Sequence, residues 1–358
     1  MSTVKFHWRL LTGGDQATTR AEQDSLAETG LPDLEARLFF CRRAEELGID
    51  SLLTAFDYAR PDPILLSAAL GMRTEKIKFI IAYRSGLLCP TSFVQQLNTL
   101  STLIDGRFSV NIVAGERPEE QHCYGDWLPH DERYARTEEF LAICRALWEA
   151  DEPVSFKGRY YKVEGGRIST PFVAPDRDFP ELFIAGSSQQ SRDVAIRQGT
   201  LWMRMADTPR NLYEKGKDVL AAGKELGLRC AIIGGRTRGE ALQKAYALVG
   251  GRSGFDHAAS EREFVRNSES VNVRATYDLA ENEWLTPWLW TGAVRTHGAP
   301  CVAILGSPRE IADGIEEFIE AGITQFIFGG WPKVEAMEFF GEEVLPLIRQ
   351  PRTLAAAQ

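Results

Sequence analysis

The run Lys78-Phe79-Ile80-Ile81-Ala82-Tyr83 indicates which fold the chain adopts. Side chains along a β-strand point alternately to the two faces of its sheet. A run that is apolar at almost every position therefore predicts a strand that is buried on both faces. Such strands are typical of parallel sheets covered by helices, and parallel neighbours need long crossover connections, which are usually helical. The run predicts an α/β protein.

Similar apolar runs recur along the chain, and stretches with helical periodicity separate most of them. The predicted strands cover residues 4–10, 51–55, 77–83, 108–114, 182–185, 201–205, 230–233 and 324–328. The predicted helices include residues 34–47, 92–103, 137–149, 210–226 and 308–321. Eight strand–helix units in about 250 residues, with insertions, are typical of a (β/α)₈ TIM barrel. We therefore predict that residues 1–358 form a single barrel domain.

A doubly wound open sheet is the alternative architecture for alternating strands and helices. Sheets of that class usually carry a G-x-G-x-x-G nucleotide-binding motif directly after the first strand. The corresponding residues here, Leu11-Thr12-Gly13-Gly14-Asp15, do not have that spacing. The barrel is therefore favoured, and no nicotinamide nucleotide site is indicated.

Two stretches interrupt the strand–helix alternation. Residues 153–178 are rich in Gly, Pro and aromatic residues and include an alternating segment that predicts a β-hairpin outside the barrel. Residues 250–300 are longer and contain Trp284, Trp288 and Trp290. A connection of that length in a compact domain is either disordered or functional. We expect this second insertion to be a mobile lid.

Composition and charge narrow the class of partner. The chain has a formal net charge of −9 and no continuous basic tract, which argues against nucleic acid or an anionic membrane and favours a small organic molecule. No apolar run approaches the roughly 20 residues of a membrane span, and the N-terminus lacks the apolar core of a signal peptide, so a cytoplasmic location is expected. The cysteines and histidines lack the close spacing of metal ligands, so no metal site is expected.

Candidate site residues follow the predicted strands, because a barrel carries its chemistry on the loops after its strands. Arg84 follows the third strand, Gly186-Ser187-Ser188 follows the fifth, and Trp331 follows the last. The serines can bind a phosphate at the start of a helix, or one of them can simply cap that helix. From the residues alone, capping is the better supported interpretation.

Three further polar positions have two interpretations each. Asn111 lies within an apolar strand, so its amide needs either backbone partners or a bound heterocycle. Arg204 also lies within an apolar strand, where it either forms a structural salt bridge or binds an anion. The segment from His130 to Tyr134 precedes a helix, and it supplies either helix-capping groups or the rim of an active site.

Several ordered segments resemble the bacterial luciferase-like monooxygenases, and most closely the FMNH₂-dependent alkanesulfonate monooxygenases. The matching segments are Ala82-Tyr83-Arg84, Cys89-Pro90-Thr91, Asp105-Gly106-Arg107, Asn111-Ile112-Val113-Ala114-Gly115, His130-Asp131-Glu132-Arg133-Tyr134, Phe183-Ile184-Ala185-Gly186-Ser187-Ser188, Leu289-Trp290-Thr291-Gly292, Arg295 and Gly330-Trp331-Pro332-Lys333. Each segment alone is a weak signal, but the ordered set covers most of the chain and is specific.

The resemblance implies a luciferase-like TIM barrel, a homodimer or homotetramer, that binds FMN reduced by a separate flavin reductase. Reduced flavin would form a C4a-(hydro)peroxyflavin with O₂ and oxygenate an organic substrate, by hydroxylation or a Baeyer–Villiger reaction. By motif, Asn111 and Ala114 would contact the flavin ring. Gly186, Ser187, Ser188 and Tyr134 would bind the flavin phosphate, which moves the two serines from capping towards cofactor binding.

The chain departs from the alkanesulfonate enzymes mainly on the substrate side. Gly13 stands where they have a histidine, Arg60 where they have a cysteine, and Trp331 where they have a tyrosine. Their Arg-x-His motif on the seventh strand finds no counterpart in residues 230–235. Either Arg60, Arg204 and Arg295 replace the missing sulfonate donors from other strands, or Trp284, Trp288 and Trp331 form a pocket for a flat or largely apolar substrate. We expect a substrate other than an alkanesulfonate.

The predicted site follows from these matches and departures. Arg60, Arg295 and Trp331 are the predicted catalytic residues, with Arg295 matching the arginine of the family's lid, and Arg84, His130 and Arg204 are predicted to contact the substrate. Three alternatives remain open: an alkanesulfonate monooxygenase that releases sulfite and an aldehyde, an F420-dependent oxidoreductase, and a flavin-binding barrel without catalysis.

Overall fold

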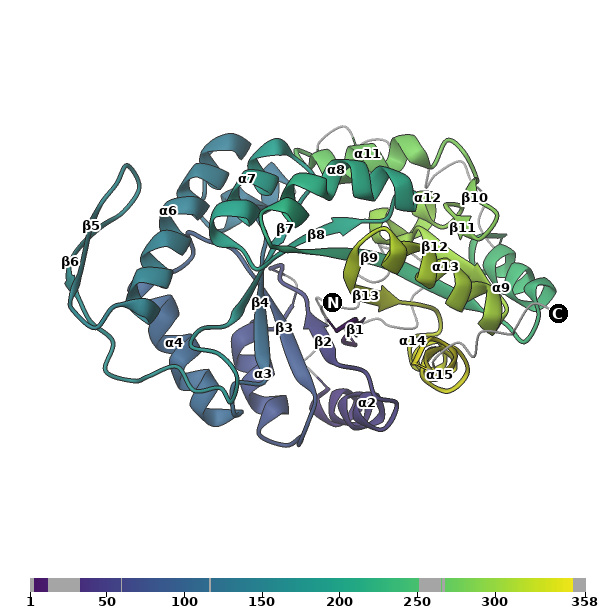
Figure 1. Cartoon of the computed structure of the whole chain (residues 1–358), viewed down its shortest axis with the longest axis horizontal. Helices are drawn as coiled ribbons and strands as arrows, with labels where there is room; N and C mark the ends of the chain where they lie inside the picture. The colour runs from purple at the N-terminus through teal and green to yellow at the C-terminus, as the bar shows by residue number, and fades with distance from the viewer. Residues whose placement is uncertain are drawn as a thin grey trace.

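The structure of the protein is a computed structural model that describes residues 3–11, 33–58, 60–115, 117–250, 265 and 268–349. Its centre is a closed barrel of eight parallel strands, and β9 closes it by pairing with both β8 and β13 (Figure 1). The barrel strands are β1 (Lys5–Arg9), β2 (Ser51–Thr54), β3 (Lys78–Tyr83), β4 (Phe108–Ile112), β7 (Glu181–Ala185), β8 (Leu201–Met205), β9 (Glu225–Gly234) and β13 (Ile323–Gly329). The predicted (β/α)₈ barrel is confirmed.

Helices surround the strands on the outside of the barrel (Figure 1). They are α2 (Leu34–Glu46), α3 (Pro63–Gly71), α4 (Pro90–Leu103), α6 (His130–Glu149), α7 (Gln189–Gln198), α8 (Pro209–Ala221), α9 (Arg238–Gly250), α13 (Pro308–Glu320), α14 (Lys333–Phe339), a π-helix (Phe340–Val344) and α15 (Leu345–Arg349). The short helix α5 (Pro118–Cys123) lies in the connection between β4 and α6. Several begin with proline, whose fixed φ suits the first helical position and whose missing N–H is not needed there.

Each predicted strand coincides with a barrel strand, but the boundary between α8 and β9 differs from the prediction. The helix predicted over residues 210–226 ends at Ala221, because Gly223 adopts a φ of 72°. A residue with that φ cannot continue a right-handed helix. Strand β9 therefore starts at Glu225, before the predicted residues 230–233.

The barrel has two apolar layers that follow from the alternation of side chains along its strands. Inside the barrel, Ile80 and Ala82 of β3 pack with residues of four other strands: Leu53, Phe183, Leu201, Met203 and Ile327. Phe79, Ile81 and Tyr83 of the same strand belong instead to the large outer core between strands and helices. Strand β3 is therefore buried on both faces, as its apolar sequence predicted.

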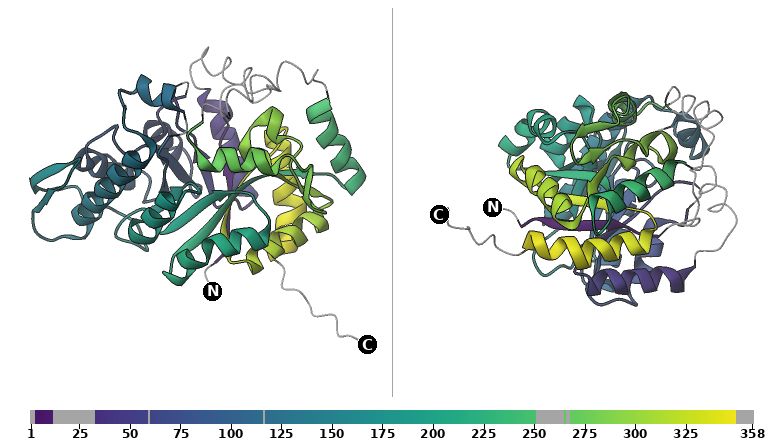
Figure 2. Two further views of the ribbon diagram at one scale, coloured as in Figure 1. Left: turned by 90° about the horizontal axis from the view of Figure 1, so that it is seen from above. Right: turned by 90° about the vertical axis from the view of Figure 1, so that its right-hand side faces the viewer.

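The first insertion forms the predicted hairpin outside the barrel. Strands β5 (Val154–Lys157) and β6 (Lys162–Gly166) pair antiparallel with each other and with no barrel strand. The hairpin projects beyond α6 at the edge of the molecule (Figures 1 and 2). No residue of the hairpin lines the barrel cavity described below.

The described part of the second insertion is largely regular structure. It contains α11 (Val271–Leu279), β10 (Trp284–Thr286), β11 (Leu289–Trp290), α12 (Val294–His297) and a 3₁₀ turn (Ala299–Cys301), and it leads into β12 (Ala303–Gly306). Strand β12, which was not predicted, extends the sheet by pairing in parallel with the end of β9. Residues 251–264 and 266–267 lie outside the described residues, and the lid movement stays a prediction.

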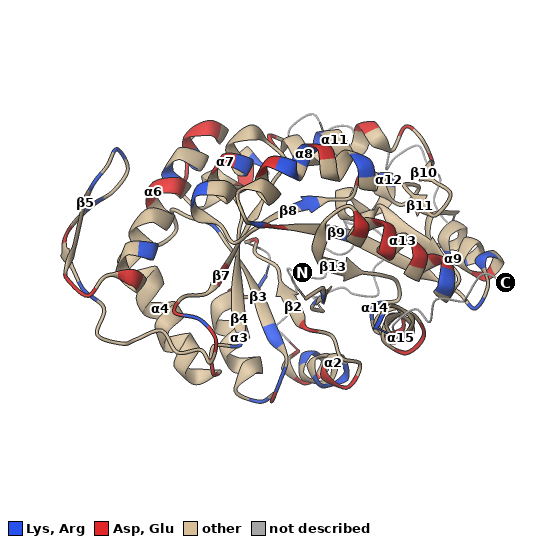
Figure 3. Cartoon of the chain, viewed as in Figure 1, with Lys and Arg blue, Asp and Glu red and all other residues tan. Residues whose placement is uncertain are grey.

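The charged residues are spread over the outer helices, where acidic and basic positions are interspersed (Figure 3). No helix within the described ranges is long and apolar enough to cross a membrane. The same ranges contain no group of three or more His, Cys, Asp and Glu side chains arranged to hold a metal ion.

Candidate functional site

A cavity of about 220 Å³ opens at the carboxyl ends of the barrel strands. Its walls come from residues in or directly after β2, β3, β4 and β7, from residues within β8, β9 and β13, and from α6 and the start of α11. The predicted site residues among its lining are Arg84, Asn111, Ala114, Tyr134, Gly186 and Arg204. Residues that are distant in the sequence therefore meet in one cavity, at the end of the barrel where its chemistry is expected.

Asn111 occupies the floor of this cavity. It lies on β4 between Ala82 of β3 and Phe183 of β7, and it is buried. Its side-chain Oδ1 is buried without a hydrogen-bond partner. Buried polar atoms are almost always hydrogen-bonded, so this oxygen is suited to accept a hydrogen bond from an N–H group of a ligand.

Arg133 holds the loop after β4 in place, although it was not predicted as a site residue. Its guanidinium donates to the carbonyl oxygens of Ala114 and Leu128, at 2.7 Å each, and to Glu269 at 2.7 Å. Arg133 is buried in α6, whose first turns place it under the loop. The backbone at Ala114 is thus fixed before any ligand binds.

Tyr134 is the next residue of α6 and reaches the end of β7. Its hydroxyl donates to the carbonyl oxygen of Ala185 at 3.2 Å. Burial raises the pKa of Tyr134 to about 12, against the opposing effect of hydrogen bonds with Ser188 and Ser191. The phenol therefore stays protonated at neutral pH, and its single O–H is donated to the Ala185 carbonyl oxygen at the end of β7.

His130, predicted to contact the substrate, does not line this cavity. Its ring packs edge-on against the Tyr134 ring, with centroids 5.0 Å apart, and its Nδ1 lies 2.9 Å from Asp131. His130 is therefore placed to support Tyr134.

Gly186 connects β7 to α7, and only glycine fits its position. Its φ is 142°, which side chains rarely adopt, and a Cβ would lie 2.6 Å from the Tyr134 hydroxyl and 2.8 Å from Ser191 Cβ. The missing side chain lets the strand end approach Tyr134 and the first turn of α7 closely.

Ser187 and Ser188 follow with different roles. Ser188 caps α7, because its Oγ accepts a hydrogen bond from the Ser191 N–H at 3.2 Å. Ser187 Oγ is buried and has no hydrogen-bond partner. The capping interpretation therefore applies to Ser188. Neither serine lines the cavity, although the neighbouring Gly186 does, and the unpartnered Ser187 hydroxyl lies next to the N-terminus of α7.

Arg84 is held by a buried ion pair. Its Nη2 lies 2.5 Å from Glu120 Oε1, and both side chains are less than 8% exposed, at 7% and 5%. The guanidinium also lies over the rings of Phe56 and Tyr124, at 5.1 and 5.8 Å. Burial raises the pKa of Glu120, and the neighbouring Arg84 opposes that shift. Arg84 thus lines the cavity as one half of an ion pair.

Arg204 contrasts with Arg84. It is 6% exposed, and its Nε and Nη1 are buried without hydrogen-bond partners. Burial lowers the pKa of Arg204 to about 10, with Asp207 acting in the opposite direction. Of the two interpretations from the sequence, a structural salt bridge finds no support, since no described carboxylate forms an ion pair with Arg204.

A second, smaller cavity of about 50 Å³ collects three cationic side chains: Arg9 of β1, Arg229 of β9 and Lys333 of α14. Burial, followed by repulsion from Arg60 and Arg229, lowers the pKa of Arg9 to about 9. Burial and repulsion from Arg9 lower the pKa of Lys333 to about 6. Because Arg229 lines both cavities, the small cavity adjoins the larger one at this residue, and we call it the side chamber.

These three cations were missed by the sequence analysis. Arg9 lies inside the predicted strand 4–10, and Arg229 directly precedes the predicted strand 230–233. The criterion that singled out Arg204, a charge within an apolar strand, would have found Arg9, and it would have found Arg229 only with a seventh strand that started at Glu225. The short boundary chosen for the seventh strand excluded Arg229 and hid a charged residue of the site.

Trp331 lines the small cavity, where its ring packs against His297 with centroids 5.0 Å apart. Trp284 and Trp288 line neither cavity. Trp288 donates to Glu317 at 3.0 Å, and Trp284 lies under Arg238 at 5.2 Å. The prediction that Trp284 and Trp288 share a pocket with Trp331 is therefore wrong. Trp284 lies in β10, and Trp288 lies between β10 and β11.

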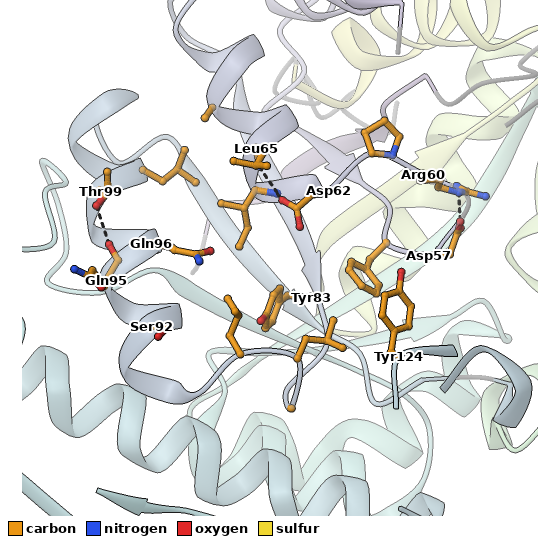
Figure 4. A pocket seen from close by; sticks show the side chains of 18 of the residues that line it. Asp57, Arg60, Asp62, Leu65, Tyr83, Ser92, Gln95, Gln96, Thr99 and Tyr124 are labelled. Carbon is orange, nitrogen blue, oxygen red and sulfur yellow. Dashed lines mark hydrogen bonds and ion pairs between the residues drawn. The ribbon is translucent and has the colours of Figure 1, made fainter. Parts of the chain in front are cut away.

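Arg60 lies in a third hollow, of about 970 Å³, between α3 and α4 (Figure 4). It forms an ion pair with Asp57, and the two side chains face each other at one end of the groove in Figure 4. Phe56 and Asp57 line this groove and also the barrel cavity. Arg60 therefore sits beside the candidate site, outside the cavity that contains Asn111.

Arg295 is exposed on α12 and lines none of these three hollows. Its predicted lid role depends on movement of a segment whose residues 251–264 and 266–267 are not described, and it stays a prediction.

Comparison with known proteins gives a family match over most of the chain. A family model described as luciferase-like monooxygenase matches residues 4–325. Among solved structures, the chain is similar to riboflavin lyase with modified FMN and riboflavin, with 21% identity, a TM-score of 0.75, and coverage of 97% of this chain and 92% of the lyase.

Two further structures show how widely this fold is used. EDTA monooxygenase from Chelativorans sp. BNC1 is 21% identical, with a TM-score of 0.73 and coverage of 97% and 93% of the two chains. An F420-dependent secondary alcohol dehydrogenase is 22% identical, with a TM-score of 0.66 and coverage of 98% and 100%. At these identities the likeness concerns the fold, so arguments about cofactor and substrate have to start from this chain's own residues.

Proposed function

The chain belongs to the luciferase-like monooxygenase family, and from this premise we propose that it is a two-component monooxygenase that uses reduced FMN and O₂ to oxygenate an organic substrate. The observation that carries the cofactor assignment is a pair of buried oxygens without partners, Asn111 Oδ1 and Ser187 Oγ. A flavin offers both the ring N–H and the phosphate that these two atoms lack.

The residues around the cavity fit FMN at both ends. Asn111 and the fixed backbone at Ala114 would hold the ring. Tyr134, which also lines the cavity, would hold the phosphate together with the N-terminus of α7 and Ser187, which follows the lining residue Gly186. Helix N-termini favour anions through their free N–H groups. The protonated phenol of Tyr134 would donate to the phosphate once its O–H turned away from the Ala185 carbonyl oxygen, which it contacts in the structure.

The protein's part in the reaction is to bind, orient and exclude water. Reduced FMN, when bound, supplies the electrons for activating O₂. Arg133 fixes the loop at Ala114, and Gly186 allows Tyr134 to approach the end of β7. The apolar lining that Met203 and Ile327 provide keeps bulk water from the barrel side of the cavity.

The side chamber supports a substrate with an acidic group. Arg9, Arg229 and Lys333 bring cationic side chains from three different elements to one small cavity. A carboxylate, sulfonate or similar group there would favour the charged form of Lys333, so substrate binding would be accompanied by proton uptake near neutral pH. The organic part of such a substrate would extend past Arg229 into the larger cavity.

We further propose that a separate flavin reductase supplies the reduced FMN and that the chain acts as a homodimer or homotetramer. The proposed location is the cytoplasm, where such a reductase would have access to it.

Turnover with a reductase tests this function. The chain is mixed with FMN, NADH, a flavin reductase and a panel of organic acids, each paired with its methyl ester, and substrate-dependent O₂ consumption and oxygenated products are measured. We expect acids to be turned over in preference to their esters. Turnover of alkanesulfonates with stoichiometric sulfite release would favour the alkanesulfonate alternative, and preference for the esters would contradict the acidic substrate.

Ser187→Ala is expected to weaken binding of reduced FMN by about 1–3 kcal/mol, because the hydroxyl would lose a hydrogen bond to a charged phosphate. This corresponds to a rise in Kd of roughly 5- to 150-fold. The unfolding free energy should stay unchanged, since Ser187 Oγ has no partner in the protein.

The Ser307→Ala variant serves as the control for a serine at the start of a different helix, α13, where it belongs to a capping box with Glu310. It should lose about 1 kcal/mol of stability and keep its FMN affinity. Equal FMN affinity in wild type and Ser187→Ala, measured by anaerobic titration calorimetry, would reject the phosphate role of Ser187.

A further inference from the structure

Building on the proposed FMN dependence, we infer that Arg204 is a ligand of the flavin phosphate and that it makes the site select FMN over unphosphorylated riboflavin. The sequence analysis had assigned Arg204 to the substrate. Its position on β8, the burial of its guanidinium and its neighbours favour the cofactor instead.

Arg204 carries a buried charge that the described residues leave without a counter-ion. Its side chain is 6% exposed, and Nε and Nη1 are both buried without hydrogen-bond partners. An arginine in such a place is normally paired, because burying an unpaired charge is unfavourable. Figure 3 shows a basic position on β8, and Arg204 is the only Lys or Arg of that strand.

Asp207 is the nearest candidate for a counter-ion, and its carboxylate is already engaged. Its Oδ1 accepts hydrogen bonds from the Thr208 N–H at 2.7 Å and from Asn211 Nδ2 at 3.0 Å. Its Oδ2 lies 3.0 Å from Lys215 Nζ. Asp207 is thus directed towards the start of α8, and Arg204 needs a different anion.

The neighbours of Arg204 place it beside the proposed phosphate site. Its guanidinium carbon lies 4.7 Å from the centre of the Trp202 ring. Trp202 Nε1 donates to Ser191 Oγ at 3.2 Å, and Ser191 lies in the first turn of α7. A single indole ring therefore separates the guanidinium from the helix turn whose N-terminus follows Ser187 and Ser188.

The alternation of β8 also separates Arg204 from the interior of the barrel. Leu201 and Met203 face the interior with the apolar side chains of neighbouring strands, whereas Trp202 lies in the outer core between strands and helices. Arg204 lies two residues after Trp202, so the two side chains point to the same face of the sheet. Arg204 therefore approaches the cavity from the side on which α7 packs. Gly186 and Tyr134, which line the same cavity, border this side.

Charge balance supports the same assignment. A phosphate monoester carries close to two negative charges at neutral pH. The serine hydroxyls and the Tyr134 phenol are neutral, and a helix N-terminus offers only a partial positive charge. Arg204 would supply the full charge, and its planar guanidinium can donate two parallel hydrogen bonds to phosphate oxygens. Riboflavin, which lacks the phosphate, would gain nothing from it.

The test compares FMN with riboflavin in wild type, Arg204→Met and Arg192→Met. Arg192 is the matched control, because it lies on α7 and pairs with Asp218 at 3.2 Å, away from the cavity lining. Dissociation constants are measured anaerobically by titration calorimetry for both flavins in their reduced forms. Thermal unfolding of each ligand-free variant is measured alongside.

We expect Arg204→Met to raise the Kd of FMN at least tenfold while leaving the Kd of riboflavin within twofold of the wild-type value. Arg192→Met should change neither constant by more than twofold. The melting temperature of Arg204→Met should not fall, since the change removes a buried charge that has no ion-pair partner among the described residues. Arg204→Lys should recover part of the FMN affinity.

Each other result overturns the assignment. If Arg204→Met leaves the FMN affinity unchanged and raises the KM for the organic substrate, Arg204 binds the substrate and not the cofactor. If the variant loses affinity for FMN and riboflavin equally, Arg204 acts on binding of the flavin ring, which both ligands share, and not on binding of the phosphate. If wild type binds FMN and the variant binds it equally well, only the Arg204 assignment fails; if wild type binds no FMN, the proposed function fails with it.

Discussion

Replacing Arg84 by methionine is expected to lower the free energy of unfolding by about 3–5 kcal/mol, because it leaves a buried carboxylate without its partner. Glu120 is 5% exposed and forms a buried ion pair with Arg84. The variant also removes the cation that lies over the Phe56 and Tyr124 rings. Chemical denaturation monitored by tryptophan fluorescence measures the change.

Two companion variants separate the ion pair from the packing. Arg84→Met combined with Glu120→Leu should recover most of the lost stability, since no buried charge remains unpaired. Arg309→Met removes an exposed pair with Asp313 and should cost no more than about 1 kcal/mol. If Arg84→Met loses no more free energy of unfolding than Arg309→Met, the buried ion pair stabilises the fold no more than an exposed one.

The stability deficit of Arg84→Met should also depend on pH. Burial already raises the pKa of Glu120, and removing Arg84 raises it further. A carboxyl group whose pKa is higher in the folded state binds more protons there, so protonation favours folding. The deficit is therefore expected to shrink as the pH falls from about 8 to about 5.

Gly186→Ala is the second change with a large expected effect, acting on both stability and cofactor binding. A Cβ at this position would lie 2.6 Å from the Tyr134 hydroxyl, and the φ of 142° is strained for alanine. The strain alone costs about 1–3 kcal/mol. Displacement of Tyr134 should in addition weaken FMN binding more than tenfold, measured by anaerobic titration.

Gly125→Ala provides the matched control for backbone strain. Gly125 also has a positive φ, of 74°, but a Cβ there meets no atom within 4 Å. This variant should lose about 1–2 kcal/mol of stability and keep its FMN affinity. If Gly186→Ala binds FMN as tightly as Gly125→Ala, the close approach of Gly186 to Tyr134 has no role in the phosphate site.

The fold could be predicted because its signal is local and repeated. Buried parallel strands such as Lys78–Tyr83 are apolar on both faces, and each is followed by a helix of the length a crossover needs. The strand β12 was missed because it has only four residues and follows a 3₁₀ turn, without the long helix that precedes most barrel strands. The end of α8 was misplaced because a single glycine, Gly223, terminates it.

The candidate site could be predicted only where a residue's type, rather than its partner, carries the information. Asn111 and Gly186 stand out as an amide in an apolar strand and a glycine before a helix. The partners of Arg84 and Arg133 cannot be read from the sequence, because Glu120 and Glu269 lie 36 and 136 residues away. Whether Arg60 or Arg204 is paired likewise depends on which side chains the fold brings near them.

The central claim is that reduced FMN binds in the barrel cavity beside Asn111 and Ser187. Anaerobic titration of the wild-type chain with reduced FMN and with reduced F420, in parallel calorimetry experiments, tests it most directly. We predict saturable binding of FMN with one site per chain and at least tenfold weaker binding of F420. Tight binding of F420 with no measurable affinity for reduced FMN would contradict the account.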